Sequence, residues 1–172
     1  MSHPVDGRGG GATDPAAVFR RLRERLLRGT AASHGLEPEG RVWAVVVEVG
    51  YPEGTATVAC LADGRASLLF SHGGAMLGGG EHESVQLRAA AIVREAERFV
   101  MLAQPAKRQP LPREGRVSTY FLTDTEILVA DTSHQALQRG RHELSPLLHA
   151  AQTVITELIR IASAQERDED PA

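Results

Sequence analysis

The sequence predicts an α+β protein with a five-stranded, mainly antiparallel sheet and helices, in the order α-β-β-β-α-β-β-α. Short polar turns separate runs of β-branched residues, which is the pattern of β-hairpins. Three other segments repeat apolar residues at helical spacing, which predicts amphipathic helices. A proline-rich segment at 104–115 (QPAKRQPLPREG) predicts a long, exposed crossing loop between two halves. Hairpins on both sides of a helix are typical of an antiparallel sheet.

The first helix is expected to begin at Thr13 or Asp14, whose side chains suit an N-cap, with Pro15 in its first turn. Its apolar stripe consists of Val18, Phe19, Leu22, Leu26 and Leu27. Its other face is basic and consists of Arg20, Arg21, Arg23, Arg25 and Arg28. Such a face can bind phosphates, anionic lipid or an acidic partner. The alternative is a solvated face whose arginines pair with acidic side chains, including those of the C-terminal tail.

The next three segments predict a meander of strands. Residues 42–49 (VWAVVVEV) are apolar except for Glu48, which predicts a central strand covered on parts of both faces. Strands at 55–62 and 65–71 follow. Asp63-Gly64 between them predicts a hairpin with a type I′ turn, in which both central residues have positive φ.

The segment Ser71–Gly80 joins the third strand to the middle helix and holds five glycines. The candidate partner or ligand loop consists of Ser71, His72, Gly73, Gly74, Gly78, Gly79, Gly80 and His82. Backbone amides at such a junction can hold an anion. The loop has no lysine of a P-loop, however, and does not fit G-x-G-x-x-G. We therefore interpret it as a loop that meets a partner surface. The alternative is an enzyme that uses this loop, with His72 and His82, on a small molecule or nucleotide.

The second half of the chain predicts a helix, a hairpin and a closing helix. The middle helix begins near Ser84, and strands at 116–122 and 127–131 form the second hairpin, followed by a polar connection at 132–142. The closing helix begins near Ser145-Pro146 and runs to about Ala162. It is apolar over more than half of its circumference, which is wide for a helix with its back to water. This surplus predicts a homodimer that associates through the last helix.

The end of the chain resembles a known group of small α+β proteins. The segments GRVSTYFLTDTEILVAD and ELSPLLHAAQTVITELIRIA resemble the closing strands and helix of roadblock-type domains, within the roadblock/longin/profilin-like group. The front half departs from that pattern because it has one more strand before the middle helix. The resemblance implies a non-enzymatic dimer that binds a partner, such as a small GTPase or a membrane-trafficking scaffold.

Length and composition set further bounds. The 172 residues fit a single domain at 13–163, with polar tails at 1–12 and 164–172 that are expected to be disordered. A net charge of −3 argues against wholesale nucleic-acid binding. Neither an apolar signal segment nor an apolar run of bilayer length is visible, so we expect a cytoplasmic protein without a transmembrane segment.

Cysteine and histidine give only weak signals for chemistry. Cys60 lies in an apolar run and is expected to be a buried, reduced thiol. The spacing from His72 to His82 matches no standard metal motif, and neither does the pair His142 and His149. We therefore expect no cofactor and no metal, and no set of catalytic residues stands out.

Overall fold

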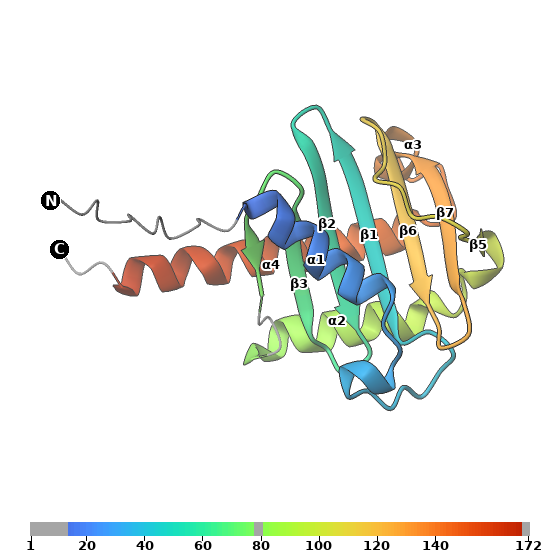
Figure 1. Cartoon of the computed structure of the whole chain (residues 1–172), viewed down its shortest axis with the longest axis horizontal. Helices are drawn as coiled ribbons and strands as arrows, with labels where there is room; N and C mark the ends of the chain where they lie inside the picture. Colours follow the sequence, from blue (N-terminus) through green and yellow to red (C-terminus); the bar gives the residue numbers. More distant parts are fainter. Residues whose placement is uncertain (1–13, 78–80, 170–172) are drawn as a thin grey trace, which may run out of the picture.

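The computed structural model describes residues 14–77 and 81–169 as one antiparallel sheet between two helical layers (Figure 1). The seven strands have the order β4-β3-β2-β1-β6-β7-β5. Their bounds are β1 (Ala44–Tyr51), β2 (Gly54–Leu61), β3 (Ala66–Phe70), β4 (Ala75–Met76), β5 (Gln104–Pro105), β6 (Arg116–Leu122) and β7 (Ile127–Ser133).

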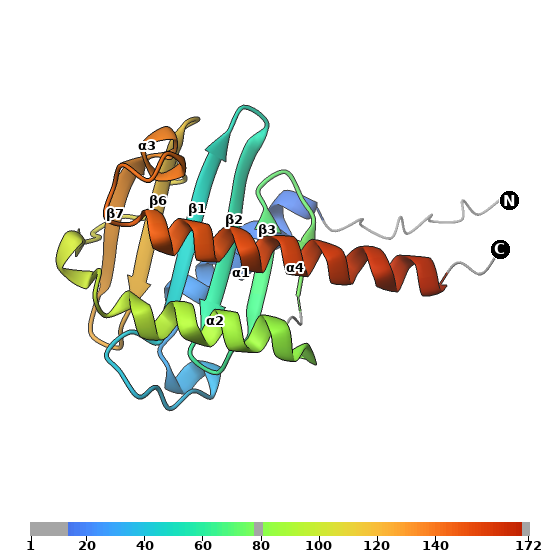
Figure 2. The same ribbon diagram turned by 180° about the vertical axis from the view of Figure 1, so that it is seen from behind.

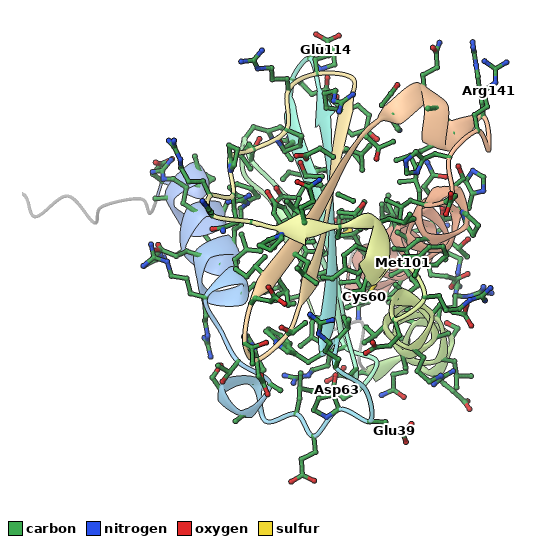
Figure 3. All side chains as sticks on the ribbon, turned by 90° about the vertical axis from the view of Figure 1, so that its right-hand side faces the viewer. Glu39, Cys60, Asp63, Met101, Glu114 and Arg141 are labelled. Carbon is green, nitrogen blue, oxygen red and sulfur yellow. The ribbon has the colours of Figure 1, made fainter. Side chains whose placement is uncertain are left out.

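The helices cover the two faces of the sheet unequally. Helix α1 (Pro15–Leu27) covers one face, and α2 (Glu83–Ala96) and α4 (Ser145–Glu169) lie side by side on the other (Figure 2). A short α3 (His134–Gln138) follows β7, and two 3-10 turns are η1 (Ala32–His34) and η3 (Val100–Leu102). Viewed along the sheet from its β5 side, the three layers separate clearly (Figure 3).

The predicted α+β class and the antiparallel sheet are confirmed, but the count of five strands is wrong. The two additional strands, β4 and β5, have two residues each and lie at the two edges of the sheet. Two residues carry no alternation that a sequence pattern can show. Helix α3 lies within the segment 132–142 that the sequence predicts to be an irregular connection, and Ser133 caps it by accepting from the backbone amide of Ala136.

Alternation along β1 divides the core into two parts. Val45, Val47 and Val49 pack under α2 and α4, whereas Ala44 and Val46 pack on the α1 side. Residues 44–50 of β1 are all buried, because this central strand has a neighbour on each side and helices over both faces. The predicted central strand is therefore confirmed.

The hairpin around Asp63-Gly64 forms as predicted, but the prediction of a type I′ turn is wrong. Gly64 has a φ of +89°. No described residue other than glycine has a positive φ, so Asp63 does not adopt the conformation that a type I′ turn requires. The Asp63 carboxylate instead accepts from the backbone amide of Arg65, at 3.1 Å. A Cβ on Gly64 would lie 2.7 Å from the carbonyl oxygen of Gln86, so glycine lets this turn approach α2.

Helix α4 is longer than its apolar stripe. It ends at Glu169, not near Ala162, because the last residues are mostly good helix formers that need no packed face. Its C-terminal turns extend past the β3–β4 side of the sheet (Figure 2). The chain therefore places a helical arm beyond the edge strand β4. Residues 1–12 and 170–172 of the predicted tails lie outside the described part of the chain.

Candidate functional site

A row of polar side chains crosses the sheet beneath α1. Thr57 of β2 and Ser118 of β6 are the register partners of Glu48, on its two sides in β1, and Ser118 is in turn the partner of Asp131 in β7. Residues opposite each other on neighbouring strands share a face, so the four side chains form one line. Glu48 is fully buried, and Thr57 and Ser118 are buried beside it.

Arg23 of α1 reaches into this row and pairs with Glu48. Its Nε and Nη2 atoms donate to the two carboxylate oxygens of Glu48 at 2.6 and 2.8 Å. The hydroxyl of Thr57 donates to the same carboxylate at 3.2 Å. Nη2 also donates to the carbonyl of Gln109 in the crossing loop, at 2.9 Å. The Arg23–Glu48 pair thus joins a helix, two strands and a loop.

The environment of the pair raises the pKa of Arg23. Burial acts to lower the pKa of Arg23, but the hydrogen bonds and the negative charge of Glu48 outweigh it, so the pKa is raised above its ordinary value. Arg23 therefore stays charged, and both oxygens of Glu48 accept its hydrogen bonds. The arrangement fastens α1 to the sheet.

Tyr120 and Asp131 complete the polar region. Burial, together with the nearby carboxylate of Glu48, raises the pKa of Tyr120 to about 12. Its hydroxyl donates to the carbonyl of Pro110 at 3.3 Å, a second link to the crossing loop. Ser118 donates to Asp131 at 2.5 Å. A phenol that holds its proton at neutral pH serves here as a hydrogen-bond donor.

The basic face of α1 differs from its expected form at one position. Arg23 points inward to Glu48 and is not part of the solvated face, with 14% of its side chain exposed. It lies four residues after Phe19 and three before Leu26, both of which are buried. Its place on the apolar stripe is therefore the sequence signal that distinguishes it from the other four arginines.

The remaining arginines of this face are exposed. Arg20 pairs with Asp14 and Arg28 with Glu24, both at the surface. Arg21 and Arg25 have no acidic partner within the described part of the chain. The basic face is thus half neutralised by its own helix and half available to a partner.

The glycine-rich segment is divided by β4, which pairs with β3 through Leu68–Met76 and Leu69–Ala75. Ser71 extends the pairing of β3 with β2, because its hydroxyl accepts from the backbone amide of Thr55 at 2.8 Å and its own amide donates to the Thr55 carbonyl at 2.9 Å. Gly73 and Gly74 have φ of +113° and +102°, values that favour glycine. Gly78, Gly79 and Gly80 lie outside the described residues.

The two histidines of this loop have separate surroundings. His72 stacks on Phe70 with a ring-centroid distance of 5.7 Å. His82 is the residue before α2 and lines a hollow under α4. No contact described for residues 14–77 and 81–169 joins the two rings, so the loop does not assemble a pair of titratable groups.

Other candidates for chemistry are engaged in structure. Cys60 is buried as predicted, and burial raises the pKa of its thiol to about 12. The Nδ1 atom of His142 accepts from the amide of Leu144, and His149 is exposed on α4. Within the described ranges, no group of three His, Cys, Asp or Glu side chains is placed to hold a metal ion.

The β4 edge carries exposed apolar side chains. A hollow of about 190 Å³ opens between β4 and α4. Its apolar lining consists of Ala75, Met76, Leu77, Leu158, Ile161 and Ala162. Leu77 is 63% exposed, and Ile159 on the neighbouring turn of α4 is 43% exposed. We call Met76, Leu77, Ile159, Ile161 and Ala162 the edge patch.

A second apolar hollow lies on the other side of the same edge. It runs between α1 and β3 and has two parts of about 540 and 270 Å³, which share Leu22 and Leu69. Its larger part is also lined by Arg25, His34 and Arg65, and by Leu77. Leu77 is thus common to the hollows on both faces of the sheet.

The chain matches no protein-family model, and searches of curated proteins and of solved structures give no significant match. Within the described residues, no helix is both long and apolar enough to cross a membrane.

Proposed function

We propose that the protein is a non-enzymatic interaction module that forms a homodimer through the β4 edge of its sheet and the adjoining part of α4. The observation that carries the proposal is the edge patch. Large apolar side chains at this edge lie in water in a single copy of the chain, although most of the chain's other apolar groups are packed.

The backbone at this edge supports the same proposal. Strand β4 ends the sheet on this side, so one row of its backbone groups has no neighbouring strand among the described residues. Edge strands are ready sites for pairing with another chain. The exposed leucine and the strand edge together favour a contact with a second copy, as twofold symmetry allows.

Most of the wide apolar surface of α4 is buried within the same copy of the chain. This limits the part of the last helix that is available for the predicted self-association. The buried residues of α4 that pack in the core with α2 and the sheet are Leu147, Leu148, Ala151, Val154 and Leu158. What is left for a partner is the stretch 159–162, close to β4. The proposed contact is therefore a limited part of the last helix.

The resemblance of the second half to roadblock-type domains agrees with a dimeric module. It adds a small GTPase as the class of further partner. The cytoplasm remains the place of action that we propose from the sequence, in which no signal segment or run of bilayer length is visible. In residues 14–77 and 81–169, no contact joins His72 to His82, and no observation there favours the alternative of an enzyme built on the two.

Light scattering on the full chain at micromolar concentration tests this proposal. We expect the mass of a dimer, with dissociation on dilution. A strict monomer across the micromolar range would contradict it.

A further inference from the structure

The hollow between α1 and β3 has the form of a small-molecule site. Helix α1 crosses the sheet obliquely and leaves part of β3 uncovered (Figure 1). The two parts of the hollow, of about 540 and 270 Å³, share Leu22 and Leu69. Sites for small molecules are concave, mostly apolar and of this size, and they carry a few polar groups that orient the ligand.

The hollow is long, and only one of its two parts is polar. The residues of α1 that line the smaller part are Pro15, Val18, Phe19 and Leu22, and those that line the larger part are Leu22, Arg25 and Leu26. At 1.5 Å per residue, the hollow follows the helix for about 16 Å. Within the described ranges, no charged residue lines the smaller part. This arrangement suits a molecule with an apolar chain and a polar head.

Donors for a negative head line the larger part. Arg25 is exposed and has no acidic partner in residues 14–77 and 81–169. The guanidinium of Arg65 is held in place, because Nε donates to Asp63 and Nη2 to the carbonyl of His34, both at 2.6 Å. These two bonds leave the Nη1 donors of Arg65 free for a ligand. The hydroxyl of Ser67 lines the same part and has no hydrogen bond to the described part of the chain.

The two arginines lie near the same imidazole. Burial is the largest cause that lowers the pKa of His34, and the positive charges of Arg65 and Arg25 act in the same direction. The carbonyl of Arg25 and the carboxylate of Asp63 oppose this shift without cancelling it. Glu81 also lines the larger part but is not among the charges that act on His34. The arginines are therefore closer to this ring than the carboxylate of Glu81 is.

We propose that the hollow binds a long-chain carboxylate, a fatty acid, with its chain over Leu22 and Leu69 and its head at Arg25 and Arg65. An extended chain of about twelve carbons has the length of the hollow. A partner helix is about 10 Å wide, so the same length of helix would fill roughly 1,200 Å³ and does not fit within both parts. The inference goes beyond the proposed homodimer and does not rest on it.

Titration calorimetry with dodecanoate, below its micellar concentration, tests the site. We expect one molecule to bind per chain. Octanoate should bind at least tenfold more weakly, because it buries four fewer methylene groups. Dodecyltrimethylammonium has the same chain with a cationic head, and it should also bind at least tenfold more weakly. No binding of dodecanoate, or equal binding of the two twelve-carbon probes, overturns the proposal.

Two charge reversals on α1 form a matched pair. Arg25→Glu should weaken dodecanoate binding at least tenfold, because attraction of the head becomes repulsion. Arg21→Glu changes the net charge equally, but Arg21 is exposed and does not line the hollow, so we expect a change within about twofold. Equal losses in the two variants would exclude a head at Arg25.

Ser67→Trp tests where the chain lies. Ser67 is half-buried on β3 and lines only the larger part among the hollows described, so an indole there should abolish binding of dodecanoate. Thermal unfolding of the variant without ligand checks its fold. Undiminished binding by a folded Ser67→Trp would place the ligand elsewhere, such as on the edge patch, and overturn the proposal. Sedimentation of the ligand-free chain tests the homodimer separately, so the two proposals can fail independently.

Discussion

Arg23 of α1 and Glu48 of β1 form a bidentate ion pair, with Nε–Oε1 and Nη2–Oε2 distances of 2.6 and 2.8 Å, although 25 residues separate them in the sequence. The pair holds α1 on a sheet face where a carboxylate would otherwise be buried without a counter-charge. It therefore acts together with the buried Phe19, Leu26 and Leu27 to hold α1 on this face of the sheet.

Removing one partner of this pair will destabilise the fold strongly. We expect Arg23→Leu to lower the free energy of unfolding by about 3–5 kcal/mol, because Glu48 would stay buried without a counter-charge. Urea denaturation measures the change. The double variant Arg23→Leu with Glu48→Leu should lose less than Arg23→Leu alone, and a larger loss in the double variant would argue against an uncompensated charge as the cause.

Gly64 is expected to resist substitution more than Gly140 does. Both have positive φ, at +89° and +68°, but only the added Cβ at Gly64 would approach the backbone of Gln86, whereas Gly140 has nothing within 4 Å. Gly64→Ala should cost about 2–3 kcal/mol, and Gly140→Ala about 1 kcal/mol. Equal thermal shifts for the two variants would show that the approach to α2 does not matter.

Stability should fall in mild acid because of His134. Burial lowers the pKa of this side chain below its ordinary 6.5, and its Nε2 atom is buried without a hydrogen-bond partner. Below pH 6.5 the unfolded chain takes up a proton that the folded chain resists, so stability present at pH 7.5 is lost toward pH 5.

His134→Phe isolates this contribution, because phenylalanine retains the edge contact with Tyr51, at a centroid distance of 5.7 Å in the wild type, but does not titrate. Urea denaturation at pH 7.5 and pH 5 should show a smaller difference for the variant. An identical pH dependence in both proteins would exclude a contribution from His134.

Local patterns predicted the main elements because each depends on nearby residues. The two hairpins and the buried central strand follow from turn residues and β-branched runs, and the α1 cap at Asp14 is confirmed by its hydrogen bond to the amide of Ala16. The turn type was missed because contact with Gln86 and the Asp63 side chain favoured another geometry. Tertiary contacts decided that detail.

The polar row was not predictable from spacing alone. A lone Glu48 in an apolar strand indicates that some cation must reach it, and Arg23 lies on the apolar stripe of α1. Their meeting depends on how α1 crosses the sheet, which no local pattern contains. The strand β4, at the edge patch, has only two residues, which is too short for a sequence pattern to predict it.

Sedimentation equilibrium of Leu77→Glu beside Met101→Glu tests the proposed homodimer most directly. Both replace an exposed apolar residue by a charge, at 63% and 85% exposure. Leu77 lies at the β4 edge, whereas Met101 precedes β5 at the opposite edge of the sheet (Figure 3). We predict that Leu77→Glu is monomeric at concentrations where Met101→Glu and the wild type are dimers. A dimer of unchanged strength in Leu77→Glu would contradict the proposed role of the β4 edge.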